Sequence, residues 1–132
     1  MKSHQIDVTK MHAVRLQSGE DLLLGLREFV KTHGIAFGVI VNGIGSASQY
    51  RVHAVKTTNM PPGDEIFGQA GPYDILNING FIIDGRVHAH VVLSDTVHAI
   101  GGHLEEGTRV LTMAIVTVAE TPAAAISDWD KF

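Results

Sequence analysis

Hydrophobic and polar positions alternate along the chain with two different periods. Residues 11–17 (MHAVRLQ) alternate one by one, which predicts a strand. The segment 18–34 instead has the three- and four-residue spacing of a helix. Ser18 is the expected N-cap, with Asp21 completing a capping box, and Gly34 is the expected end. The stripe that should face the core consists of Leu22, Leu23, Leu26, Phe29 and Val30.

Most of the remaining chain has the pattern of strands. The predicted strands are 35–46, 49–57, 73–83, 86–94, 97–102 and 109–119. The first is a continuous apolar run interrupted by glycines, as expected for a strand buried on both faces. Residues Asn59–Pro72 hold three of the four prolines and three glycines, which predicts a long and functional loop.

One helix and about six or more strands predict an α+β fold, with the helix packed on a mostly antiparallel, twisted sheet. We expect a single domain over residues 1–132. In the tail, 120–132, Trp129 and Phe132 are expected to pack onto the body or onto a neighbouring subunit. Leu24 lies outside the helix stripe and is either exposed or turned toward a partner.

Composition narrows the function classes. The chain of 132 residues has a net charge of −4 and no basic run, which argues against direct nucleic-acid binding. It contains no cysteine, so any metal must be held by nitrogen and oxygen ligands. The first residues lack the apolar core of a signal peptide, and no apolar run approaches the ~18 residues of a membrane span. We therefore expect a cytoplasmic protein.

Two glycine motifs invite a functional interpretation. Gly43-Ile44-Gly45 is similar to part of a dinucleotide-binding loop, but a β-like segment follows it where that loop needs a helix. A turn or bulge between strands is the better prediction. Gly101-Gly102 predicts either a bulge or a close approach of the backbone to a ligand or another chain.

The segment Val87–His103 carries four of the eight histidines. His88 and His90 project from one face of a strand, because side chains alternate along it. If the hairpin loop is Asp95-Thr96 or Ser94–Val97, His88 sits opposite His103 and all three share a face. A three-residue loop would bring His98 to that face instead. We favour His88, His90 and His103.

Three histidines on one face predict a site for zinc or a similar divalent metal. Three protein ligands and an open position for water are typical of catalytic zinc. A structural site needs a fourth ligand, for which Asp74, Glu105, Glu106 or a residue of another subunit are the candidates. The alternative is a set of histidines that form ordinary hydrogen bonds or are exposed.

The motifs NGIGS, HAHVVLSD and GGHLEEGTRVLTMAIV, in that order, resemble the PPC family (plants and prokaryotes conserved). The likeness covers about Met11 to Ala119. It implies an α/β or α+β sheet domain that forms a homotrimer, and a metal site at the histidines that correspond to His88, His90 and His103.

The chain also departs from that family. Plant members carry AT-hooks that bind DNA, but this chain has no Arg-Gly-Arg-Pro core, so DNA binding is not carried over. Asp74 stands where the family usually has Glu, and Met113-Ala114 replaces an acidic residue. Any role that depends on those two carboxylates is in question.

Two hypotheses on function follow. The first is a trimeric metal-binding protein, and potentially an enzyme with a small-molecule ligand at a subunit boundary, using metal-assisted hydrolysis or lyase chemistry. Asp74 or Glu105 would then be the acid/base group, and Arg86 or Arg109 would pair with an anionic substrate. The second is a non-enzymatic assembly or regulatory module that contacts DNA only indirectly or not at all.

Overall fold

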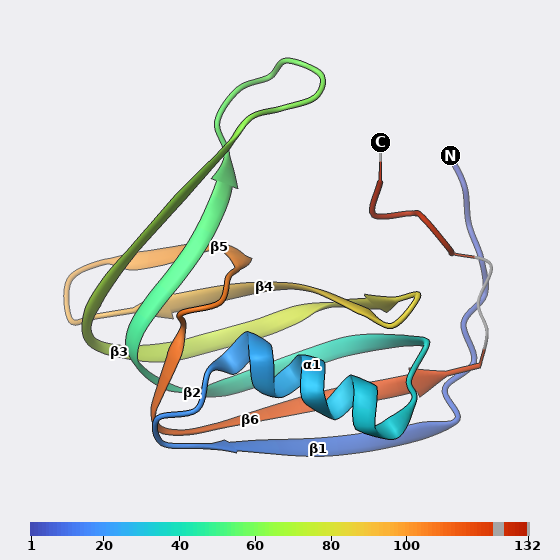
Figure 1. Ribbon diagram of the computed structural model, residues 1–132, viewed down its shortest axis with the longest axis horizontal. Coiled ribbons are helices and arrows are strands. Elements are labelled where there is room, and N and C mark those ends of the chain that lie inside the picture. The colour runs from blue at the N-terminus through green and yellow to red at the C-terminus, as the bar shows by residue number, and fades with distance from the viewer. Residues whose placement is uncertain (123–125, 132) are drawn as a thin grey trace.

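The computed structural model, which describes residues 1–122 and 126–131, has one antiparallel sheet with a helix on one face (Figure 1). The predicted α+β class is confirmed. Seven elements follow one another in the described part: β1 Lys10–Gln17, α1 Leu22–His33, β2 Phe37–Val55, β3 Asp64–Ile83, β4 Arg86–Ser94, β5 Ala99–Leu104 and β6 Arg109–Thr121.

The sheet curls until its last strand meets a strand from its middle. The strand order is β1-β6-β2-β3-β4-β5, and β5 also pairs with the distal end of β2. Two residue pairs make this contact, Val52 with Leu104 and His53 with His103. The strands β2, β3, β4 and β5 therefore form a closed ring of pairings, which places β5 between β4 and β2.

The helix begins three residues later than the capping box predicted. Asp21, not Ser18, is the N-cap, and its Oδ1 accepts hydrogen bonds from the backbone N–H groups of Leu23 and Leu24, both at 3.1 Å. Its Oδ2 accepts a third from Gly107, at 2.7 Å. This distant contact fixes Asp21 at the start of the helix. Gly34 ends the helix in the left-handed conformation, as predicted.

The core lies between α1 and the inner face of the sheet. The helix packs against β1, β4 and β6. Most of the predicted stripe is buried there, with Phe29 only partly covered. β4 contributes its alternate residues to this core: Val87, Ala89, Val91 and Leu93.

The strand boundaries of β2 and β3 correct two predictions. The segments 35–46 and 49–57 are not separate strands, because β2 runs through both with three register shifts. Gly43-Ile44-Gly45 forms no turn and pairs in continuous register with β6, and the shifts lie on either side of it. Residues 64–70, predicted as part of a loop, pair with the far half of β2. The remaining loop, 56–63, projects away from the body (Figure 1).

The prediction that the strand at 35–46 is buried on both faces is wrong for the single chain. Val41 is 48% and Ile44 is 55% exposed. We define an exposed apolar set on the sheet by the following residues: Val41, Ile44, Leu76, Phe81, Val92, Leu111 and Ile115. The single chain thus presents an uncovered apolar surface.

The tail folds back on the body. Ile126 is buried, and Trp129 lines a small cavity with Ile6 and Phe81. Phe132 lies outside the described residues. Within the described ranges, no helix combines the length and apolar character needed to cross a membrane; the expected cytoplasmic location stays a prediction.

Candidate metal centre

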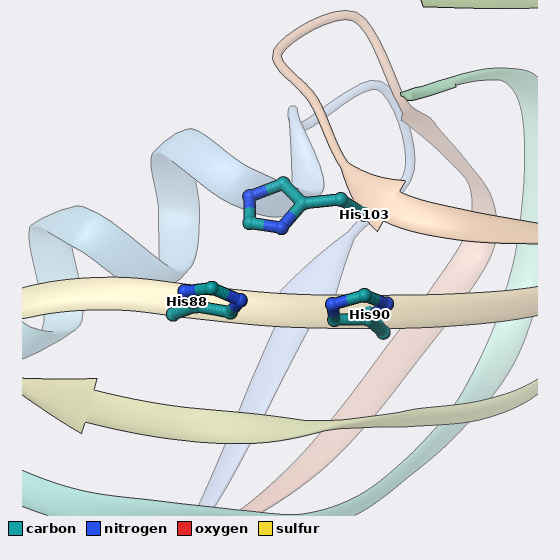
Figure 2. A group of neighbouring side chains, drawn as sticks. All are labelled: His88, His90 and His103. Atoms are coloured by element: carbon teal, nitrogen blue, oxygen red, sulfur yellow. The ribbon is translucent and has the colours of Figure 1, made fainter. Parts of the chain in front are cut away.

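Three histidines from neighbouring strands converge on one face of the sheet (Figure 2). His88 and His90 come from β4 and His103 from β5. The ring centroids are 4.7 Å apart for His88 and His103, 5.2 Å for His90 and His103, and 5.7 Å for His88 and His90. One nitrogen of each ring lies within 4.8 Å of the other two, so the three can reach one metal ion.

The hairpin has an even loop, but its register differs from the prediction. His103 pairs with His90 and not with His88, because the four loop residues are 95–98. The shift is two residues, so it preserves the face on which each side chain lies. Asp95 holds this loop, since its Oδ1 accepts hydrogen bonds from the backbone of Val97 and His98. His98 lies in the turn with its side chain 73% exposed, away from the cluster.

The double glycine forms no bulge, because β4 and β5 pair in continuous register through it. The close-approach alternative describes it better, with β2 of the same chain as the neighbour. A Cβ on Gly102 would lie 2.6 Å from the carbonyl oxygen of His53. At Gly101 the nearest atom would be the carbonyl oxygen of Val91 at 3.0 Å. The missing side chain at Gly102 therefore permits β2 to reach β5.

The sequence assigned no role to His53, yet this residue adjoins the cluster. Its ring stacks on that of His103, with centroids 4.4 Å apart and planes 23° from parallel. Its Nδ1 lies 2.6 Å from Oε1 of Glu105. The alternation of residues 49–57 was visible in the sequence. The sequence around His53 does not indicate, however, that β2 pairs with β5. The contact between His53 and His103 could therefore not be predicted from it.

Of the two predicted acid/base residues, only Glu105 lies beside the histidines. Asp74 pairs with Ser94 at the loop end of β4. Ser94 is four residues from His90, which is about 13 Å along a strand. Within the single chain, the structure therefore does not bring Asp74 to the three histidines.

The other predicted polar residues are held by partners. Glu106, a candidate fourth ligand, forms an ion pair with Arg27. Arg86 is bound to Asp130 of the tail, with 3.0 Å between Nη2 and Oδ1. Arg109 donates to the carbonyl of Gly19 at 3.3 Å. To bind an anionic ligand, either arginine would therefore have to give up its present contact.

The surroundings disfavour protonation of two of the imidazoles. Burial first, and then the positive charges that His53, His88 and His90 acquire on protonation, together lower the pKa of His103 to about 4. The pKa of His90 is lowered for the same reasons, with burial first. Near neutral pH both rings thus keep a nitrogen lone pair available, which is the form that binds metal.

The cluster opens to two cavities. One, of about 570 Å³, is lined by the three candidate ligands and His53. Val55, at the end of β2, and Pro62, in the projecting loop 56–63, also line it. The other, of about 590 Å³, shares His88 and His103 and is lined by Arg27, Lys31 and Asp130. A molecule of a few heavy atoms can therefore approach the histidines from either side.

Comparison with known proteins supports the resemblance found in the sequence. A family model described as the Plants and Prokaryotes Conserved (PCC) domain matches residues 4–122. One curated relative, the bifunctional protein GlmU of a Synechococcus species, is 27% identical over 114 residues, which are 86% of this chain. The chain spans only 17% of the length of that relative.

Solved structures share the fold. A PPC protein from Pyrococcus horikoshii has a TM-score of 0.78 at 24% identity, covering 93% of this chain and 86% of that one. A protein from Archaeoglobus fulgidus described as metal-containing has a TM-score of 0.77 at 24% identity, covering 93% and 87%. Two further structures are described only as candidate DNA-binding proteins. At these identities the likeness establishes the fold alone.

Proposed function

The chain belongs to the Plants and Prokaryotes Conserved (PCC) domain family, and we propose that it binds a divalent metal ion, zinc, through His88, His90 and His103. The observation that carries this proposal is the convergence of three ligand nitrogens within 4.8 Å of one another. The description of the Archaeoglobus relative as metal-containing supports it.

The donor set suits zinc better than a hard cation. Zinc accepts neutral imidazoles readily, whereas calcium and magnesium prefer oxygen ligands. Zinc bound by three protein ligands retains an open position, at which it acidifies water or polarises a carbonyl. The residues of this chain would supply the ligands and the cavity of about 570 Å³ in which a small molecule meets them. We propose metal-assisted hydrolysis or lyase chemistry for such a ligand.

The test is metal analysis of protein purified without an affinity tag. We expect His88→Ala and His90→Ala each to lose about one equivalent of zinc, and His103→Ala to lose at least one, since removing a ligand weakens binding by more than the about 10- to 100-fold cost of losing an outer hydrogen-bond partner. His98→Ala is the matched control, because His98 belongs to the same hairpin and lies away from the cluster. Unchanged metal content in the three variants would refute the proposal.

A second candidate function, an assembly module, is favoured by the exposed apolar set. Seven apolar side chains of the sheet, each 38 to 55% exposed, lie uncovered in the single chain. We propose that a homotrimer buries them. Replacing Ile44 with Lys would then produce monomers in sedimentation experiments, whereas Leu24→Lys, on the exposed side of the helix, would not. A monomeric wild-type protein would exclude this assembly.

Direct DNA binding is the weaker interpretation, given the net charge of −4. Tight binding of duplex DNA with a steep salt dependence would show that the protein binds DNA directly.

A further inference from the structure

A second group of metal-ligating side chains lies directly beside the three histidines. The ligand atoms of His53, His103 and Glu105 are also within 4.8 Å of one another. His53 comes from β2, His103 from β5 and Glu105 from the position after β5, and they meet because β5 pairs with β2. His103 is common to both groups.

The charge of Glu105 distinguishes this group from the first. Glu105 is only 28% exposed, and its one ion-pair partner among the described residues is His53. The adjacent Glu106 is instead paired with Arg27. A carboxylate that is largely withdrawn from water and whose ion-pair partner is an imidazole is a favourable place for a cation.

The side chains are also held in position before any ion binds. His53 is 22% exposed, stacked on His103, and hydrogen-bonded to Glu105 at 2.6 Å. A site whose ligands are already ordered binds without the entropy cost of collecting them. Two imidazole nitrogens and one carboxylate oxygen form a donor set that suits zinc.

We propose that His53, His103 and Glu105 form a second metal position, so that the centre holds two divalent ions. The inference rests on the proposed function only through His103. Imidazole has two ring nitrogens, and His103 serves both ions by directing one nitrogen to each, while its remaining ring proton passes to solvent water. The ion at the second position replaces the hydrogen bond between His53 and Glu105.

Two ions at adjacent positions repel each other, and the negative charge of Glu105 offsets this only in part. The second ion therefore binds more weakly than the first, by about ten-fold or more. The cavity of about 570 Å³, lined by His53 as well as the first three histidines, has room for both ions and a bound small molecule.

The experiment is a zinc titration of the metal-free, untagged chain, with a chromophoric chelator as competitor. Wild-type protein should bind two equivalents. His53→Ala and Glu105→Gln should each bind one, with the tight affinity of the wild type. His88→Ala should also bind one, and His103→Ala should bind neither tightly. His33→Ala, at the end of α1, is the control and should bind two.

The outcomes separate this inference from the proposed function. One tight equivalent in wild type that is unchanged in Glu105→Gln and His53→Ala would overturn the second position and leave the first intact. Loss of metal in Glu105→Gln with no effect of His88→Ala would overturn the first position and leave the second. Glu105→Gln retains the size of the side chain and its hydrogen-bonding capacity. The result therefore does not depend on whether the alanine variants fold.

Discussion

The two faces of β4 share one backbone and have opposite chemistry. Its inner face contributes Val87, Ala89, Val91 and Leu93 to the core, whereas His88 and His90 project from the outer face. Burial of the inner face fixes the strand against α1 and β3. Because a shift by one residue would exchange the faces, the same packing also fixes where the histidines point.

This comparison shows how the candidate site is maintained. The core side chains on the inner face hold the strand in register and so determine the face from which His88 and His90 project. Substitutions on the two faces should therefore separate stability from metal binding.

The two faces of β4 should differ most in how much a substitution lowers the stability of the fold. Leu93 is fully buried, so Leu93→Ala should lower the free energy of unfolding by about 2 to 5 kcal/mol through lost contacts and a cavity. His90→Ala, measured in metal-free protein, should change it by less than about 0.5 kcal/mol. Urea denaturation of both variants provides the measurement. A comparable loss for His90→Ala would mean that the outer face has a structural role of its own.

Elements with a clear local pattern could be predicted from the sequence, whereas their long-range contacts could not. The alternation within β4 placed His88 and His90 correctly on one face, and Gly34 marked the end of α1. The helix start was missed because a tertiary bond from Gly107 helps to hold Asp21.

The same limit explains the incomplete site. His53 is 50 residues from His103 in the sequence and reaches it only through the pairing of β2 with β5. Neither strand carries a local signal for that pairing. The first part of β3 likewise has the sequence pattern of a loop, because Gly68, Gly71 and Pro72 are typical turn residues and the partner strand is not visible in the local pattern.

The double glycine permits a second comparison, between substitutions at two neighbouring positions of β5. Gly102→Ala should lower the free energy of unfolding by about 1 to 3 kcal/mol, because the new Cβ would meet the carbonyl oxygen of His53 at 2.6 Å. Gly101→Ala should cost less, since its nearest contact is 3.0 Å. Gly102→Ala should also weaken the second metal position more than the first. Equal effects at both glycines would argue against the close approach of β2.

The outer face should also make stability depend on pH. The pKa of His103 is about 4 in the folded protein and 6.5 in an unperturbed histidine, so below pH 6.5 the unfolded chain takes up a proton that the folded chain does not. The metal-free protein should lose stability as pH falls from 6.5 to 4, and His103→Ala should lose less over this window. Because the ring is partly exposed, we expect an effect below about 1 kcal/mol. Urea unfolding at pH 7 and pH 4.5 tests it. Equal losses in both proteins would contradict the assignment.

The smallest expected effect concerns the tail, which reaches the outer face from a distant part of the chain. Oδ2 of Asp130 lies 3.8 Å from Nδ1 of His88, and Arg86 holds the same carboxylate in place. A carboxylate beside a ligating histidine orients the ring and raises its basicity. Asp130→Asn should therefore weaken zinc binding at the first position by up to about three-fold, less than the about ten-fold or more that loss of a full hydrogen bond gives. Asp128→Asn is the control, because Asp128 pairs only with Lys131 among the described residues. If chelator competition shows equal affinities for the two variants, then β4 alone orients His88, and the tail covers the site without contributing to it.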